Sequence, residues 1–279
     1  MIERMRLGWA LTKQSWAVVR DDRTLLLFPI VAAVASLGLA VIFFFLGIGG
    51  AAAIDNVWGG APALVIGVYA IAVVGQFAGV ALAHCASQSL QGEQTTFADG
   101  FAAARARIRS ILLWSLLAVV VGAAISALQS LLREVAGNLL GSILGGILNA
   151  TWGVATFFVI PILAHEEISP VDAVKRSAGI VKERWGEGVA GSASIGLAIF
   201  LLGYLPGIAL AAGGLALIDS FAPLGVLVLA AGVVVFVIAT VIQIAVSSVF
   251  RVALYRFATS GEAVGGFQQD QLANAFRAK

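Results

Sequence analysis

Two short stretches of the sequence carry side chains that could bind a metal ion or transfer protons. The two histidines of the chain lie in them, in His84-Cys85 and His165-Glu166-Glu167. A catalytic metal needs about three protein ligands, commonly histidine, cysteine or carboxylate. If the two stretches met, His84, His165 and Glu166 would form a two-histidine, one-carboxylate set. A lipid-modifying membrane enzyme built on this set is the third of three functional hypotheses.

The motifs that identify an enzyme class are absent from the sequence. It contains no G-x-S-x-G nucleophile turn, Walker loop or H-E-x-x-H zinc motif. The single cysteine, Cys85, permits no internal disulfide, and we interpret it as a small buried apolar residue. We therefore predict a protein that is not an enzyme, with no catalytic residue, no cofactor and no metal site.

The composition is that of a membrane protein. Of the 279 residues, 60% are hydrophobic and only 11% are charged, and the mean hydropathy is +1.00. Soluble domains carry about 25% charged residues, so a soluble enzyme and a disordered protein both fit poorly. The net charge of +2 is too small to indicate a nucleic-acid partner.

Six charge-free runs are each longer than the roughly 20 residues that a helix needs to cross a bilayer. The period-2 alternation of a membrane barrel is absent. We predict an all-α protein whose single domain, residues 1–257, precedes a short cytoplasmic tail at 258–279. The predicted spans lie at about 25–48, 62–84, 110–130, 144–164, 189–212 and 224–250.

The gaps between the runs alternate in charge. Asp55, the pair Arg133-Glu134, and Asp219 stand at short hairpin tips, whereas the other gaps and both chain ends are long and basic. The positive-inside rule places the basic segments and both termini in the cytoplasm. We therefore expect three transmembrane hairpins in the inner cell membrane.

A basic amphipathic segment precedes spans 1, 3 and 5, at about 4–22, 97–109 and 170–185. Such helices lie in the membrane interface with their cations facing anionic lipid. The stretches 13–20 and 175–182 align residue by residue, which favours a triplicated unit of surface helix and hairpin. Anchoring of the next span is the simpler role for these helices. Their candidate headgroup-binding residues are Arg105, Arg107, Arg109, Lys175, Arg176, Lys182 and Arg184.

Uncharged polar side chains lie inside the spans, whereas ionisable ones are missing from the span centres. Ion-coupled carriers usually place an ionisable group at membrane depth. The candidates here are Gln76, Asn149 and Gln243, which would join helices through hydrogen bonds or line a narrow polar path. A channel or facilitator for a small neutral or apolar solute is therefore the second hypothesis.

The stretch Ala253-Leu254-Tyr255-Arg256-Phe257-Ala258-Thr259-x-Gly261 resembles the C-terminal signature of an uncharacterised family of six-span prokaryotic integral membrane proteins, a domain of unknown function. The segment Ser169-Pro170-x-x-Ala173-x-x-x-Ser177 more distantly resembles the membrane domain of some bacterial glycerophosphodiester phosphodiesterases. The resemblance implies an architecture and no established activity.

The leading hypothesis is a non-enzymatic membrane-organising or accessory protein. Its expected partners are the lipid bilayer, the anionic lipids of the cytoplasmic leaflet, and a second copy of the chain or another protein. No nucleic-acid partner is expected.

Overall fold

The computed structural model describes residues 2–184, 199–261 and 263–267, and all regular elements in those ranges are helical. Six helical segments are long and apolar enough to cross a membrane. The predicted all-α class with six membrane-spanning helices is therefore confirmed. The relation of the hairpins to one another and the side on which the termini lie stay predictions. The six segments are Thr24–Ala53, Trp58–Ser89, Ile108–Val135, Gly137–His165, Phe200–Ile218 and Ala222–Ser260.

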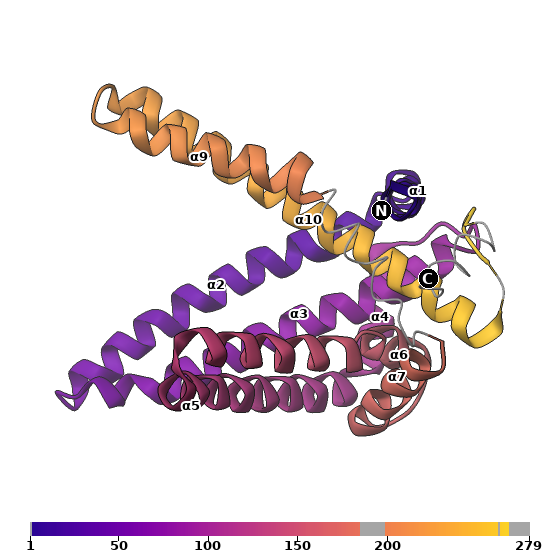
Figure 1. The fold of residues 1–279 in the computed structure, drawn as a ribbon, viewed down its shortest axis with the longest axis horizontal. Helices are drawn as coiled ribbons and strands as arrows, with labels where there is room; N and C mark the ends of the chain where they lie inside the picture. The colour runs from indigo at the N-terminus through magenta and orange to yellow at the C-terminus, as the bar shows by residue number, and fades with distance from the viewer. Residues whose placement is uncertain (1, 185–198, 262, 268–279) are drawn as a thin grey trace. The chain divides into compact units, whose positions relative to one another are not determined.

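The chain divides into two compact units, and Figure 1 labels their helices. The central unit comprises residues 27–85 and 95–186, and the terminal unit comprises 1–26, 86–94 and 187–279. The central unit holds most of α2 (Thr24–Ala53) and α3 (Ala61–Ser89), together with η1 (Val57–Gly60), α4 (Phe97–Ala106), α5 (Ile108–Ala155), α6 (Val159–His165) and α7 (Pro170–Arg184). The terminal unit holds α1 (Ile2–Asp21), η2 (Phe200–Tyr204), α9 (Leu205–Ile218) and α10 (Ala222–Ser260).

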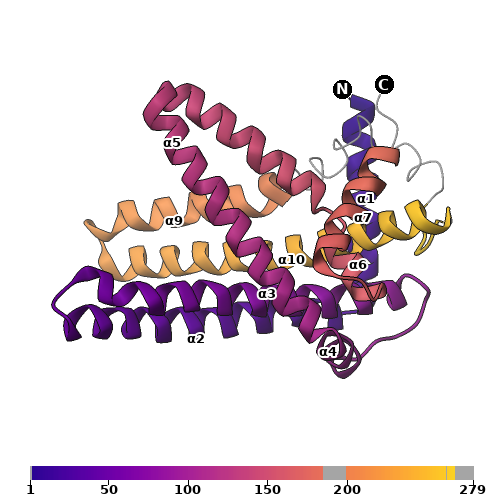
Figure 2. The same cartoon turned by 90° about the horizontal axis from the view of Figure 1, so that it is seen from below.

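Helices α2 and α3 approach each other closely near the turn that joins them (Figure 2). A Cβ atom added to Gly50 or to Gly59 would collide with the backbone carbonyl of the other glycine. A Cβ on Gly67 would lie 2.7 Å from the Cβ of Phe43. Helices in lipid associate through such contacts at small residues, because lipid tails are as apolar as the side chains.

Helix α5 contains two membrane-spanning arms that a glycine separates. Gly137 has φ 83° and ψ 162°, a conformation that residues with a Cβ avoid. A Cβ on Gly141, one turn into the second arm, would lie 2.5 Å from the backbone N of Arg133. The rings of Trp114 and Trp152 stack with centroids 6.1 Å apart. The two arms therefore pack against each other within the chain.

The predicted span at 144–164 is two helices in the structure. The second arm of α5 ends at Ala155, and the chain resumes a helix as α6 at Val159. Pro161 explains the interruption, because proline has no N–H to donate to the carbonyl four residues earlier and disfavours helical geometry just before it.

Helix α9 lies beside the first part of the longer helix α10, and the two meet through glycines (Figure 1). On α9, Gly207 and Gly214 are two turns apart, and Gly225 and Gly232 have the same spacing on α10. A Cβ on Gly232 would lie 2.5 Å from the backbone N of Ala211. These glycines serve packing within one chain.

Helix α10 is longer than the predicted span at 224–250 and crosses the predicted domain boundary at 257. It ends at Ser260, where Gly261 adopts φ 75° and its N–H donates to the carbonyl of Phe257 at 2.9 Å. A left-handed glycine is a common helix terminator. Residues 189–198 of the predicted fifth span and 268–279 of the predicted tail lie outside the described residues.

Candidate functional site

Helix α4, the surface helix that precedes the third span, begins with a complete capping box. The hydroxyl of Thr96 accepts from the N–H of Asp99, and the Asp99 carboxylate accepts from the N–H of Thr96 at 2.9 Å. The hydrogen bonds from Thr96 lower the pKa of the Asp99 carboxyl. A capping box satisfies two backbone donors that the helix itself leaves open.

The inner face of α4 packs tightly against α3 and α2. A Cβ on Gly100 would lie 2.7 Å from the sulfur of Cys85, so this position tolerates only glycine without a shift of neighbours. Phe97 stacks on Phe28 with ring centroids 5.0 Å apart. Cys85 is fully buried, in agreement with its interpretation as a small buried residue. These contacts fix the orientation of α4.

The three arginines at the junction of α4 and α5 differ in their surroundings. Arg105 and Arg109 are exposed, and neither forms an ion pair with a described residue. Arg107 is only 22% exposed, and its guanidinium lies 2.9 Å from a carboxylate oxygen of Glu167. Sequence reasoning grouped all three as lipid-binding candidates, but Arg107 is held by protein.

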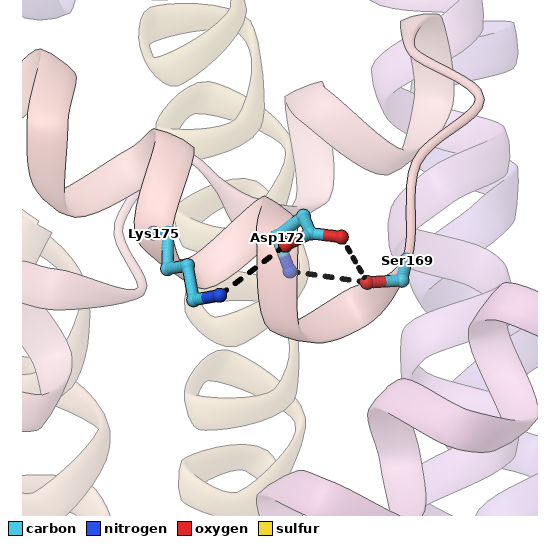
Figure 3. Close-up of polar contacts among 3 residues, drawn as sticks. All are labelled: Ser169, Asp172 and Lys175. Atoms are coloured by element: carbon cyan, nitrogen blue, oxygen red, sulfur yellow. Dashed lines mark hydrogen bonds and ion pairs between the residues drawn. The ribbon is translucent and has the colours of Figure 1, made fainter.

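Helix α7, which precedes the fifth span, also begins at a capping side chain (Figure 3). The hydroxyl of Ser169 accepts from the N–H of Asp172 at 3.2 Å and donates to its carboxylate at 2.6 Å. The ammonium of Lys175 lies 3.5 Å from the same carboxylate. The hydroxyl of Ser169 is the main cause of the lowered pKa of Asp172.

One face of α7 is buried in the central unit. Ala173 and Ser177 are completely buried, and Val181 is 9% exposed. The hydroxyl of Ser177 accepts a hydrogen bond from the N–H of Phe158 at 3.0 Å. This N–H lies at the interruption between α5, which ends at Ala155, and α6, which begins at Val159. The helix is thereby fixed in rotation about its own axis.

The cations of α7 lie off this buried face. Lys175, Arg176 and Lys182 are exposed. Arg176 lies 3.6 Å from Glu166, whereas Lys182 forms no ion pair with any residue that the structure describes. The side chain of Arg184 lies outside the described residues.

The polar residues inside the spans are found on three different helices. Gln76 is half-buried on α3, and Asn149 is exposed on α5, where it donates to the carbonyl of Gly145 at 2.9 Å. Gln243, on α10, donates to the hydroxyl of Ser247 at 2.9 Å. For Asn149 and Gln243 these hydrogen bonds lie within one helix, and a shared polar path through the three residues stays a prediction.

The histidine-containing stretches do not form a metal centre. Across residues 2–184, 199–261 and 263–267, no group of three His, Cys, Asp or Glu side chains is placed to hold a metal ion. The imidazole Nδ1 of His165 lies 2.7 Å from the carbonyl oxygen of Pro161 in its own helix. The structure therefore does not bring His84, His165 and Glu166 together as a ligand set.

Sequence reasoning missed the contacts that fix the surface helices. The Ser177 hydroxyl is in the quoted Ser169–Ser177 motif, but the motif does not reveal Phe158 as its partner. The pair of Arg107 and Glu167 joins residues far apart in the chain. No local sequence pattern predicts either contact.

The comparison with known families matches residues 60–266, from the end of η1 to beyond α10, to a model described as a family of unknown function (DUF6159). The chain belongs to this family. No curated protein matches it. Together with the six apolar helices, the match supports a multi-pass membrane protein of the DUF6159 family. The more distant resemblance to the membrane domain of glycerophosphodiester phosphodiesterases stays a prediction.

Proposed function

We propose that this DUF6159 protein is a non-enzymatic membrane-organising protein of the inner cell membrane. It gathers anionic lipids of the cytoplasmic leaflet around its surface helices α4 and α7. The geometry of α7 carries the proposal, because Ala173 and Ser177 fix one face of the helix to the protein. A fixed helix presents its cations in a constant direction.

Three exposed cations supply the charge for lipid binding. Arg105, Arg109 and Lys182 have no carboxylate within ion-pair distance among the described residues. A Lys or Arg near an anionic membrane surface contributes about 1 kcal/mol of attraction. An arginine or lysine already paired with Asp or Glu contributes less, since the pair is close to neutral. Arg107 and Arg176 therefore have a smaller role than the sequence predicts.

Electron paramagnetic resonance of spin-labelled lipid tests the proposal. The full chain is reconstituted in vesicles with labelled phosphatidylglycerol or labelled phosphatidylcholine. We expect the motionally restricted fraction to be larger for phosphatidylglycerol. The triple variant R105Q/R109Q/K182Q is expected to lose that difference, and the charge-preserving variant R105K/R109K/K182R is expected to keep it. Equal fractions for both lipids around the natural chain would contradict the proposal.

The same vesicles test the channel hypothesis. Specific flux of a small neutral solute that depends on Gln76 or Gln243 would overturn the membrane-organising role. Lipid enrichment without flux supports it. A complex with a second copy or another protein that forms equally well without anionic lipid would indicate that the cations bind protein instead.

A further inference from the structure

An apolar groove lies in the terminal unit between α1, α10 and the π-helical turn η2. Its volume is about 280 Å³. Trp9 and Trp16 of α1 line one side, and Leu202 of η2 lines the other. Ala239 and Val246 of α10 lie at its base, with exposed fractions of 5% and 1%. In a bilayer such a groove is in contact with lipid tails rather than with water.

The polar residues that line the groove both come from α1. They are Thr12 and Lys13, and no Asp or Glu is among the lining residues. Lys13 is exposed, so its ammonium remains accessible. Trp9 and Trp16, two turns apart, are partly exposed beside it. Tryptophan is enriched where the headgroups begin, and lysine there attracts anionic lipid. The groove thus combines an apolar base with one positive charge.

The helix opposite α1 is irregular at the groove. The turn Phe200–Tyr204 is π-helical, and a Cβ on Gly203 would lie 2.6 Å from the Cβ of Ala239. Single π-helical turns within α-helices are frequent at functional sites. The close approach at Gly203 brings η2 and α10 together. Leu202, which is 68% exposed, borders the groove.

A groove of similar size lies in the central unit. It measures about 330 Å³ and lies between α4 and the pair α2 and α3. Phe97 and Phe101 of α4 line it together with Phe28 and Phe77. In both units, therefore, a surface helix borders a groove formed by two membrane-spanning helices. Because this arrangement occurs in both units, it favours a specific feature of the fold over a packing defect.

We propose that the groove lined by Trp9, Lys13 and Val246 is a binding site for one anionic phospholipid. One acyl chain occupies the apolar base, and the lipid phosphate lies beside the Lys13 ammonium. The lipid class rests on the proposed function, whereas the site itself does not. It differs from the exposed cations around α4 and α7, because Lys13 lies beside an apolar groove whose residues come from three elements of the terminal unit.

Native mass spectrometry of the full chain in mild detergent tests this site. Titration with phosphatidylglycerol is expected to give one retained lipid, bound more tightly than phosphatidylcholine. Lys13→Gln is expected to weaken the affinity for phosphatidylglycerol about fivefold, because one surface cation is lost. The affinity for phosphatidylcholine is expected to stay unchanged. Arg23→Gln is the matched control, because Arg23 is an exposed cation of the same unit that forms no ion pair with a described residue and does not line the groove.

A second set of variants tests the acyl-chain site. Ile242→Trp fills the groove and is expected to abolish retention of both lipids. Ala230→Trp adds the same side chain at an exposed position of α10 that does not line the groove, and it is expected to change nothing. If Ile242→Trp lowers helical content, Leu202→Trp replaces it, because Leu202 is largely exposed and tolerates a larger side chain.

The outcomes separate the two proposals. The proposed lipid site is overturned if a folded groove-filling variant retains lipid, or if the natural chain retains none. Equal affinity for both lipids overturns the role of Lys13. Neither result depends on Arg105, Arg109 or Lys182. The proposed lipid site in the groove is therefore tested independently of the proposed lipid enrichment around α4 and α7.

Discussion

The backbone N–H of Phe158 donates to the buried hydroxyl of Ser177 at 3.0 Å. The bond joins the beginning of α6 to the middle of α7, and Ser177 is completely buried. An amide left without a partner in such a place costs about as much as a lost hydrogen bond. One side chain of the surface helix thus satisfies the backbone at the interruption of the fourth span.

Replacing Ser177 with alanine is expected to destabilise the protein by about 1–3 kcal/mol, because the buried Phe158 N–H loses its acceptor. Ser15 is the matched control, since it aligns with Ser177 in the repeat and is equally buried. Its hydroxyl has no hydrogen-bond partner among the described residues. Ser15→Ala is expected to be neutral or stabilising. Thermal unfolding in detergent measures both, and equal midpoints for the two variants would refute the prediction.

Adjacent glycines on α9 are expected to respond oppositely to alanine. A Cβ on Gly214 would collide with the backbone of Leu229, so Gly214→Ala is expected to destabilise the protein by about 1–3 kcal/mol. Gly213 has open space around it. Gly213→Ala is expected to be neutral or to stabilise the helix by up to about 1 kcal/mol. Unfolding by increasing denaturing detergent compares the variants, and a stable Gly214→Ala protein would disprove the packing at this point.

The cap of α7 is expected to make stability depend on acid pH. The Ser169 hydroxyl lowers the pKa of Asp172 below its ordinary value of 3.8. A folded-state pKa below the unfolded value stabilises the fold above pH 3.8. That contribution is lost as the pH falls through the lowered folded-state pKa. Ser169→Ala is therefore expected to lower the unfolding temperature at neutral pH, with a difference that shrinks below pH 3.8.

Circular dichroism at a series of pH values measures this difference. Ser260→Ala is the control, because the Ser260 hydroxyl donates to the carbonyl oxygen of Arg256 rather than to a carboxylate. A Ser169→Ala difference that stays constant across the acid range would mean that Asp172 is not stabilised by the cap.

Arg107 and Arg109 are expected to affect different measurements. Arg107→Gln removes a half-buried partner of Glu167 and is expected to lower stability by up to about 1 kcal/mol. Arg109→Gln is expected to leave the unfolding temperature unchanged and to reduce the phosphatidylglycerol preference. Spin-label spectra and melting curves of the same two samples provide the comparison. Loss of lipid preference in Arg107→Gln alone would reverse the assignment.

The predicted topology can be tested with single cysteines. Cys85 is buried and is first replaced by alanine. Cysteines introduced at Asp55, Glu134 and Asp219 are expected to react with an impermeant thiol reagent on intact cells. A cysteine at Lys182 is expected to react only after the membrane is permeabilised. Labelling of Lys182→Cys from outside would place the basic helices, and hence the termini, on the opposite side.

The sequence was sufficient for the number and type of the long helices, because a bilayer demands length and apolarity that composition reveals directly. It was also sufficient for the start of α7, since Ser169-Pro170 is a local signal with a local cause. The sixth span was predicted at about 224–250, and α10 extends beyond it to Ser260. A charge-free run marks the apolar part of a helix and not its end, and α10 continues past Arg251 and Arg256 to the left-handed Gly261.

The candidate site was predictable only in part. Charge spacing located the cations, but whether each faces lipid or a carboxylate depends on residues distant in the chain, as Arg107 and Glu167 show. The groove beside Lys13 could not be predicted from the sequence for the same reason. It arises where α1 packs against α10, and no periodicity within either helix records that contact.

The packing of α1 against α10 has a consequence for biosynthesis. The ribosome makes α1 first, whereas α10 is released only after the intervening hairpins have been inserted. Until then α1, whose Leu11 and Val19 are fully buried in the folded chain, lacks its neighbour α10. A nascent chain stalled before α10 therefore presents the undocked apolar face of an amphipathic helix to chaperones and membrane proteases. Quality control could use this single segment to recognise an unfinished protein.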